Sequence, residues 1–159
     1  MKKNNQATRA SMTLILLGVV CWIITSCAQS KNLIKIVGVS MEPSYPEGTQ
    51  MRIEEVKPTE LTRGDLIYFK LELNSQYYVK RLIGLPGETI KLAPAGIYID
   101  GVLLSEHYDV IPESYDTKTF ILSEDTYFVL GDNRPNSLDS NNFGAILGSE
   151  IIGRAVPID

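Results

Sequence analysis

The stretch Tyr77-Tyr78-Val79-Lys80-Arg81-Leu82-Ile83-Gly84 predicts an apolar β-strand that carries two adjacent cations. Aromatic and β-branched residues favour a strand, and successive side chains of a strand point to opposite faces of its sheet. Lys80 and Arg81 therefore lie on opposite faces, each among apolar neighbours. Whichever face of the sheet is buried, one of the two cations is buried with it.

Similar short β-rich runs follow one another from Asn32 onward, separated by Gly, Pro and Asn. Many short strands at close spacing are typical of an antiparallel barrel or sandwich. Asp100-Gly101, between two apolar runs, predicts a type I′ hairpin turn. No window beyond the N-terminus keeps a helical apolar repeat, so we expect a mostly β domain. The expected strands are 33–39, 50–54, 65–72, 77–84, 89–92, 97–99, 102–104, 119–122, 127–130 and 151–156. Residues 93–123 look like an excursion inserted into this domain.

Residues 1–30 have a different composition from the rest of the chain. Basic residues precede an apolar run over 12–24, which small residues follow, and this is the pattern of an export signal. As an uncleaved transmembrane anchor, the run would cross the cytoplasmic membrane once and leave residues 31–159 on the extracytoplasmic side, by the positive-inside rule. As a lipoprotein signal, Ile24-Thr25-Ser26-Cys27 resembles a lipobox, and lipidated Cys27 would tether the domain. A buried core helix is the third interpretation. We favour the anchor.

Composition excludes several kinds of chemistry. The chain has one histidine, His107, and two cysteines, Cys21 and Cys27, both in or beside the apolar run. A zinc site needs several such ligands converging from a folded domain, and a thiolate is disfavoured in an apolar segment. The net charge is −4, with no Lys/Arg cluster beyond the N-terminus, which argues against nucleic-acid binding. We interpret His107 as a surface residue. An enzyme of this composition would move protons through lysine or carboxylates.

Three segments hold candidate chemistry. Ser40 ends a β-rich run ahead of Pro43, and such a position exposes a side chain on a fixed backbone. A lysine desolvated by apolar neighbours has a lowered pKa, so Lys80 could take a proton from a hydroxyl. Taken singly, Ser40 also fits an ordinary turn, and Lys80 an edge strand whose cations reach water. The polar loop Gly131-Asp132-Asn133-Arg134-Pro135-Asn136-Ser137-Leu138-Asp139-Ser140 directly follows an apolar strand, where sites are commonly built.

Together these segments resemble the bacterial type I signal peptidases, the membrane-bound Ser/Lys leader peptidases. Four boxes carry the resemblance in order along nearly the whole chain. They are Ser40-Met41-Glu42-Pro43-Ser44, Arg63-Gly64-Asp65-Leu66-Ile67-Tyr68-Phe69, Tyr78-Val79-Lys80-Arg81-Leu82-Ile83-Gly84-Leu85-Pro86-Gly87-Glu88, and the loop from Gly131 to Ser140. The chain departs from the family pattern at Gly38, Ser44, Pro135 and Asn141.

The resemblance implies a signal-peptidase type β-domain behind one transmembrane helix, and a serine endopeptidase that removes signal peptides from exported preproteins. By resemblance, Ser40 is the nucleophile and neutral Lys80 the general base. Ser137 would orient the Lys80 ammonium, and Asp139 would pair with Arg81. One oxyanion donor would be the Ser40 N–H, and Gly38 lacks the hydroxyl that supplies a second donor in some relatives.

The resemblance also predicts the partners of the chain. Shallow pockets would accept small residues at the −1 and −3 positions of an extended signal peptide, which would add as a strand beside the segment before Ser40. The residues expected to line them are Ile36, Met41, Tyr78 and Val79. The residues expected to rest on the bilayer are Leu33, Ile34, Ile36, Val37 and Tyr45. We expect a monomer that needs neither metal nor organic cofactor. Two alternatives stay open: a peptidase specialised for one secretion or conjugation system, and a non-catalytic lipoprotein that binds a partner.

Overall fold

The computed structural model describes residues 32–158. The expected membrane segment 12–24 and the lipobox at Cys27 lie outside the described residues. Within 32–158, none of the helices has the length and apolar character needed to cross a membrane.

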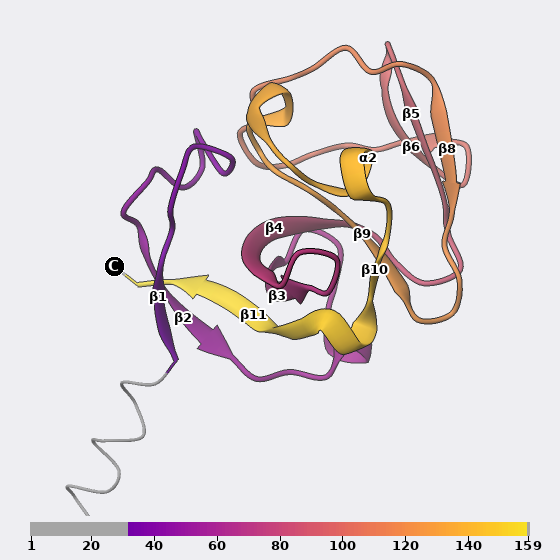
Figure 1. The fold of residues 1–159 in the computed structure, drawn as a ribbon. Helices are drawn as coiled ribbons and strands as arrows, with labels where there is room; N and C mark the ends of the chain where they lie inside the picture. The colour runs from indigo at the N-terminus through magenta and orange to yellow at the C-terminus, as the bar shows by residue number, and fades with distance from the viewer. Residues whose placement is uncertain (1–31, 159) are drawn as a thin grey trace, which may run out of the picture. The chain divides into compact units, whose positions relative to one another are not determined.

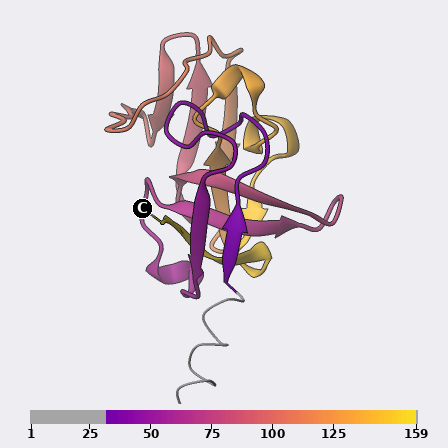
Figure 2. The same ribbon diagram turned by 90° about the vertical axis from the view of Figure 1, so that its left-hand side faces the viewer.

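Two β-sheets make up the described domain (Figures 1 and 2). The larger has seven strands in the order β1-β2-β11-β3-β4-β9-β10, and the smaller has the order β7-β6-β5-β8. In chain order the strands are β1 (Leu33–Lys35), β2 (Gln50–Glu54), β3 (Leu66–Leu71), β4 (Gln76–Gly84), β5 (Thr89–Ala93), β6 (Gly96–Ile99), β7 (Val102–Leu103), β8 (Lys118–Ile121), β9 (Thr126–Leu130), β10 (Ile146–Leu147) and β11 (Ile151–Pro157). The registers of β2 to β11 are all antiparallel, which confirms the prediction of a mostly antiparallel β domain.

The central strands of the larger sheet are covered on both faces. Along β3, Ile67 and Phe69 belong to one hydrophobic cluster, whereas Leu66 and Tyr68 belong to another. A third cluster fills the space between the smaller sheet and the strands β4 and β9, and includes Ile83. Because alternate side chains of β3 and β4 enter different clusters, these strands carry apolar residues at successive positions.

Most expected strands appear within a residue or two of their predicted bounds, and the exceptions have local causes. The first strand ends at Lys35, short of the predicted Val39, because the chain bends at Gly38, whose φ is 82°, and then enters the turns that hold Ser40. The short strand β10 and the short helix α2 (Ser140–Phe143) were not predicted, since two apolar residues are too few to show a period. The described residues also form three 3₁₀ turns: η1 (Pro58–Glu60), η2 (Arg134–Asn136) and η3 (Gly148–Glu150).

The segment predicted as an excursion lies within a structured part of the domain. The smaller sheet begins at Thr89, four residues before the predicted start of the excursion at residue 93. Its strands β7 and β8 are separated by residues 104–117, which form no strand. Asp100 and Gly101 connect β6 to β7 with positive φ angles of 49° and 83°, which confirms the predicted type I′ turn.

Candidate active site

Ser40 lies in the turns between β1 and β2, and the loop after β9 holds its backbone in place. The Asn133 N–H donates to the Ser40 carbonyl oxygen at 3.1 Å. The side-chain amide of Asn133 donates to the neighbouring Val39 carbonyl oxygen at 3.2 Å. Ser40 is therefore fixed by contacts from a segment that is distant in the sequence, although it belongs to no strand.

Lys80 contacts Ser40 from the middle of the larger sheet. It pairs with Ile67 across β3 and β4, and its Nζ donates to the Ser40 Oγ at 2.5 Å. Lys80 is 3% exposed and Arg81 is 5% exposed, so both cations are buried. The strand pattern required the burial of only one of them. The edge-strand interpretation is wrong, because β4 lies between β3 and β9.

Burial sets the protonation of Lys80. It lowers the pKa of Lys80 to about 8, although the carboxylates of Asp139 and Asp132 attract the proton and oppose this shift. Desolvation disfavours the charged form of an amine. With that pKa, about a tenth of Lys80 is neutral at pH 7, and in the neutral form its Nζ can accept the Ser40 hydroxyl proton across the same contact.

Arg81 pairs with Asp132, and the predicted pairing with Asp139 is wrong. The Arg81 Nε donates to Asp132 Oδ1 at 2.8 Å and its Nη2 to Oδ2 at 2.5 Å, while its Nη1 donates to the Gly64 carbonyl oxygen at 2.9 Å. Burial alone would lower the pKa of Arg81, but the Asp132 carboxylate raises it above its ordinary value. Asp132 is 0% exposed and Arg81 is 5% exposed, so this ion pair is buried. Its two-pronged geometry fixes both β4 and the loop.

Asp139 instead holds the two ends of the loop together. Its Oδ2 accepts from the Gly131 N–H at 3.0 Å, and its Oδ1 accepts from the Asn141 N–H at 3.1 Å. Asp139 is also the N-cap of α2. Burial raises its pKa, whereas the Gly131 N–H and the nearby Lys80 charge act in the opposite direction. Asn141 is one of the positions where the chain departs from the family pattern, and its side chain accepts a hydrogen bond from the Lys118 Nζ at 2.8 Å.

Ser137 lies beside the pair but does not bond to Lys80. Its Oγ is buried near the Asp139 carboxylate and has no well-formed hydrogen bond to any residue within 32–158. Gly131 explains how closely these groups pack: a Cβ there would lie 2.3 Å from the Ser137 Oγ and 2.5 Å from the Ser40 carbonyl oxygen. A side chain at 131 would therefore displace the nucleophile segment or the loop. The spacing of the motif gave no sign of this role.

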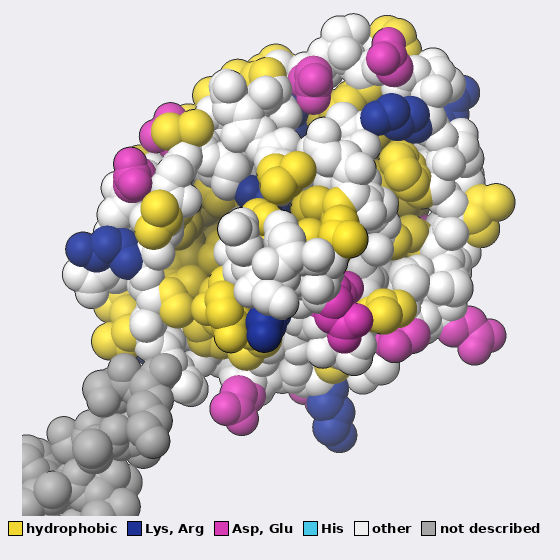
Figure 3. Space-filling model, viewed as in Figure 1, with side chains coloured by type: hydrophobic (Ala, Val, Ile, Leu, Met, Phe, Trp, Pro, Cys, Tyr) yellow, Lys and Arg dark blue, Asp and Glu magenta, His cyan; other side chains and the backbone are white. Residues whose placement is uncertain are grey.

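A cleft of about 240 Å³ opens next to Ser40 and Lys80. The four residues predicted to line a substrate pocket all lie in its wall. The full lining is Ile34, Lys35, Ile36, Val37, Ser40, Met41, Tyr68, Tyr77, Tyr78, Val79 and Lys80. Figure 3 shows hydrophobic side chains gathered on the side of the domain where β1 and β2 lie. Leu33 (48% exposed) and Val37 (83%) are open to solvent here, whereas Ile36 is buried at 5% and cannot rest on a bilayer as expected.

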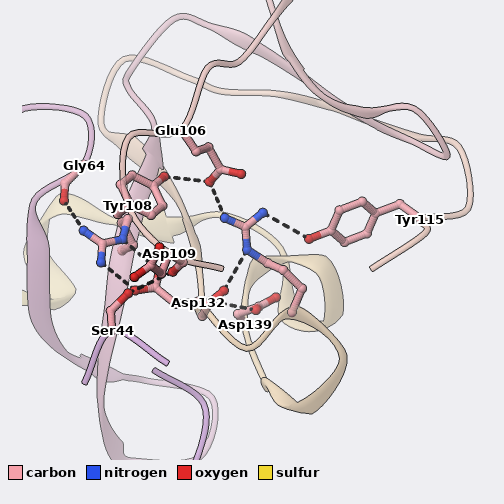
Figure 4. Close-up of polar contacts among 11 residues, drawn as sticks. Ser44, Gly64, Glu106, Tyr108, Asp109, Tyr115, Asp132 and Asp139 are labelled. Carbon is pink, nitrogen blue, oxygen red and sulfur yellow. Dashed lines mark hydrogen bonds and ion pairs between the residues drawn. The ribbon is translucent and has the colours of Figure 1, made fainter. Parts of the chain in front are cut away.

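Residues from the predicted excursion also reach the site. The Tyr108 ring lies 3.8 Å from the Arg81 guanidinium carbon, and Glu106 pairs with Arg134 of the loop (Figure 4). Sequence reasoning missed both residues. The available signal was an acidic and an aromatic side chain flanking His107 in a stretch with no strand pattern. His107 itself is exposed, as expected.

The site contains no metal-binding arrangement within the described part of the chain, where no group of His, Cys, Asp or Glu is placed to hold an ion. Position 38 carries no hydroxyl: the Gly38 backbone has a φ of 82°, and its N–H donates to Glu47 Oε1 at 3.3 Å. The two reactive groups that the structure brings into contact are the Ser40 hydroxyl and the buried Lys80 amine.

Comparison with known proteins identifies the class to which this fold and site belong. Residues 7–158 match the family described as "Signal peptidase, peptidase S26". The chain is 35% identical to signal peptidase I V of Bacillus subtilis over 79% of this chain and 86% of that protein. It is 32% identical to the probable signal peptidase I-2 of Synechocystis sp., over 73% of this chain but only 57% of that longer protein.

A solved structure agrees with this result. The crystal structure of a signal peptidase I from Enterococcus faecalis V583 superposes with a TM-score of 0.53 at 38% identity, covering 60% of this chain and 96% of that one. The chain belongs to the signal peptidase family S26, the class of serine endopeptidases that remove signal peptides.

Proposed function

We propose that this chain removes signal peptides from exported preproteins with Ser40 as the nucleophile and Lys80 as the general base. The observation that carries the proposal is the 2.5 Å contact between the Ser40 Oγ and the buried Lys80 Nζ. Burial lowers the pKa of Lys80 to about 8, which keeps part of the amine neutral. A general base works best when its pKa lies near the operating pH. A binding module has no need of this arrangement, so the alternative of a non-catalytic lipoprotein is not favoured.

The proposed reaction uses the Ser40–Lys80 pair twice. Neutral Lys80 takes the hydroxyl proton as Ser40 attacks the scissile carbonyl carbon, and the Lys80 ammonium then gives that proton to the leaving amine. A water molecule then attacks the resulting ester on Ser40 while Lys80 takes a proton from it. The ester C–O bond breaks, the Lys80 ammonium returns the proton to the Ser40 oxygen, and the cleaved signal peptide leaves with a new carboxylate. The Ser40 N–H is the proposed oxyanion donor. No step needs a cofactor.

The neighbouring residues are proposed to support this pair in different ways. Asp139 attracts the Lys80 proton and holds Gly131, so it places the loop beside Ser40. Arg81 neutralises Asp132, whose charge would otherwise raise the pKa of Lys80 further. The free Ser137 hydroxyl is proposed to accept from the Lys80 ammonium once Ser40 has been acylated and no longer accepts.

We propose that the cleft beside Ser40 selects small side chains in the substrate. Met41 is 1% exposed and Ile36 is 5% exposed, so they form a closed floor. Tyr78 and Val79 add a half-buried wall. An extended signal peptide would lie along β1, with alternate side chains entering the cleft. A floor of buried apolar groups fills space, so it excludes large residues at the −1 and −3 positions.

We propose that the peptidase domain works on the extracytoplasmic side of the cytoplasmic membrane. The apolar run over 12–24, preceded by basic residues, is the proposed single-pass anchor, and residues 31–159 are the exported domain. Val37 lines the cleft, and Leu33 directly precedes the cleft residue Ile34. Both side chains are exposed and are proposed to rest on the lipid surface. The proposed active form is a monomer.

A cleavage assay tests the catalytic pair. Purified full-length protein in detergent is incubated with a secretory precursor, and Ser40→Ala and Lys80→Ala are compared with the wild type. We expect no product from Ser40→Ala, and kcat lower by at least about 10² for Lys80→Ala, because general-base catalysis contributes about 10²–10⁴.

Matched controls separate chemistry from folding. Ser149→Ala removes an exposed hydroxyl in the turn η3, and Lys91→Ala removes an exposed lysine. Both should cleave at close to the wild-type rate. Wild-type cleavage by Ser40→Ala or by Lys80→Ala would overturn the proposed pair.

A further inference from the structure

Residues 106–111 belong to no strand, but they contact Arg81 and the loop after β9. Figure 4 shows Glu106, Tyr108 and Asp109 beside the residues that hold the catalytic loop. The Asp109 carbonyl oxygen accepts from the Ser44 Oγ at 2.9 Å, close in sequence to Ser40. The segment therefore contacts the nucleophile turn as well as the loop.

Tyr108 covers the guanidinium group of Arg81. The guanidinium carbon lies 3.8 Å from the ring centroid, which is a stacking distance. The Tyr45 ring lies farther away, at 5.9 Å. Asp132 and Gly64 therefore accept hydrogen bonds from the edges of the Arg81 guanidinium group. The Tyr108 ring covers one of its faces. This leaves the guanidinium a single orientation, in which it stays next to Lys80 and holds Asp132.

Glu106 connects Tyr108 to the other arginine of the loop. Its Oε1 accepts from the Tyr108 hydroxyl at 2.7 Å and is also bonded to the Arg134 Nη2. Arg134 is 6% exposed, and its Nε donates to the Gly131 carbonyl oxygen at 2.8 Å. Burial and the Glu106 carboxylate both raise the pKa of Tyr108, so its hydroxyl stays a donor.

Backbone bonds extend this connection to the nucleophile. The Ile111 N–H donates to the Asp132 carbonyl oxygen at 2.9 Å, and the Arg134 N–H donates to the Ile111 carbonyl oxygen at 3.1 Å. Asn133, between Asp132 and Arg134, donates to the Ser40 carbonyl oxygen. Tyr108 is thus connected to Ser40 through Arg81, Asp132 and Asn133, and to Lys80 through its neighbour Arg81.

We propose that Tyr108 is a positioning residue, whose ring, held by Glu106, fixes the Arg81–Asp132 pair and so the alignment of Ser40 with Lys80. This inference rests on the proposed function of the pair. Tyr108 does not line the cleft, so it acts on the geometry of the reacting atoms and leaves substrate binding alone. A misplacement of about 1 Å costs up to about 10² in rate.

Steady-state kinetics of three variants test the inference. Tyr108→Leu removes the ring but keeps an apolar side chain, and we expect kcat to fall by between about ten- and a hundredfold while KM stays within about twofold. Tyr108→Phe keeps the ring over Arg81, so it should restore most of the activity. Glu106→Gln should lower kcat less than Tyr108→Leu, also with KM unchanged, and it serves as the second test if Tyr108→Leu does not fold.

Two controls match these changes in residue type and in place. Tyr98→Leu removes a tyrosine ring that lies 5.9 Å from the Lys91 amine in the smaller sheet, and His107→Ala changes the exposed residue between Glu106 and Tyr108. Both should keep the wild-type kcat. An unchanged kcat in Tyr108→Leu, a loss expressed in KM, or a Tyr108→Phe variant as slow as Tyr108→Leu would overturn the positioning role.

Amide hydrogen exchange gives a readout that does not depend on activity. The Asn133 amide, which donates to Ser40, should exchange about tenfold faster in Tyr108→Leu than in the wild type, because local opening of the loop becomes easier. Tyr98→Leu should leave it unchanged. If the wild type fails to cleave any precursor, the proposed function is wrong, whereas unchanged Asn133 exchange in Tyr108→Leu contradicts the positioning role itself.

Discussion

Lys80 is held in a position that is unfavourable for its charge. It is 3% exposed, with Tyr78 and Ile67 as strand neighbours, and its pKa falls to about 8 from an ordinary value of 10.5. A depressed lysine pKa means that the charged form costs free energy in the folded state. The same burial that makes Lys80 a usable base therefore lowers the stability of the fold.

This cost can be measured with Lys80→Met. At pH 7 the folded wild type carries a buried charge, and a shift from 10.5 to about 8 corresponds to about 3 kcal/mol, at about 1.4 kcal/mol per pH unit. We expect Lys80→Met to be inactive but more stable than the wild type by up to that amount. Between about pH 8 and about pH 10 the unfolded wild type binds more protons than the folded one, so its stability rises and the gap narrows.

Urea unfolding at a series of pH values checks this prediction, with Lys91→Met as the control. Lys91 is exposed, so its variant should differ from the wild type only by a small amount. A Lys80→Met variant that is less stable than the wild type at pH 7 would show that Lys80 is not strained by burial.

At the residue scale, much of the site could be predicted from short motifs. Ser40, Lys80 and the four residues of the cleft lie in segments whose sequence pattern is local. The partner of Arg81 could not be predicted, because Asp132 and Asp139 lie in the same loop and only its folded path shows which of them faces β4. The 3₁₀ turn η2 lies between the two carboxylates, the helix α2 begins directly after Asp139, and neither element has a strong sequence signal.

In the loop between β9 and α2, Asp132 pairs with Arg81 of β4, whereas Asp139 bonds to Gly131 within the same loop. Replacing these two carboxylates should therefore change the stability of the fold by different amounts. Asp132→Asn leaves Arg81 buried without a charged partner, which typically costs about 3–5 kcal/mol. Asp139→Asn keeps one carbonyl acceptor, but its NH₂ group then faces one of the two N–H groups from which Asp139 accepts, so we expect a cost of about 1–3 kcal/mol, smaller than that of Asp132→Asn.

Measuring the free energies of unfolding of Asp132→Asn and Asp139→Asn at neutral pH tests this prediction. Because burial already disfavours the charged form of Asp139, replacing it by a neutral group adds no further desolvation cost. A larger loss of stability in Asp139→Asn than in Asp132→Asn would mean that Asp139 is the essential partner of Arg81, as the family pattern had indicated.

At the element scale, strands were easier to predict than the segments between them. The alternation and punctuation of β2 to β6 gave their bounds closely, since both features depend on neighbouring residues. Residues 104–117 have no such period, yet they place Glu106 and Tyr108 against the loop. These contacts depend on how the smaller sheet packs on β4 and β9, which a local pattern does not contain.

For the whole molecule, the site is assembled from three distant segments. The turns after β1 supply Ser40, β4 supplies Lys80, and the loop after β9 joins them through Asn133. The segment 104–117, which connects β7 to β8 of the smaller sheet, adds a cover through Tyr108. The chain belongs to the signal peptidase family, and three of the four motifs that carry the resemblance supply these three segments.

The central claim is that a neutral Lys80 activates Ser40, and the pH dependence of kcat/KM tests it most directly. This parameter reports the pKa values of the free enzyme. For cleavage of a secretory precursor, we expect kcat/KM to rise about tenfold per unit below the pKa of Lys80 and to level off above about pH 8. The residual activity of Lys80→Ala should lack this rise. A wild-type profile that is flat across this range, or a rise that Lys80→Ala retains, would contradict the account.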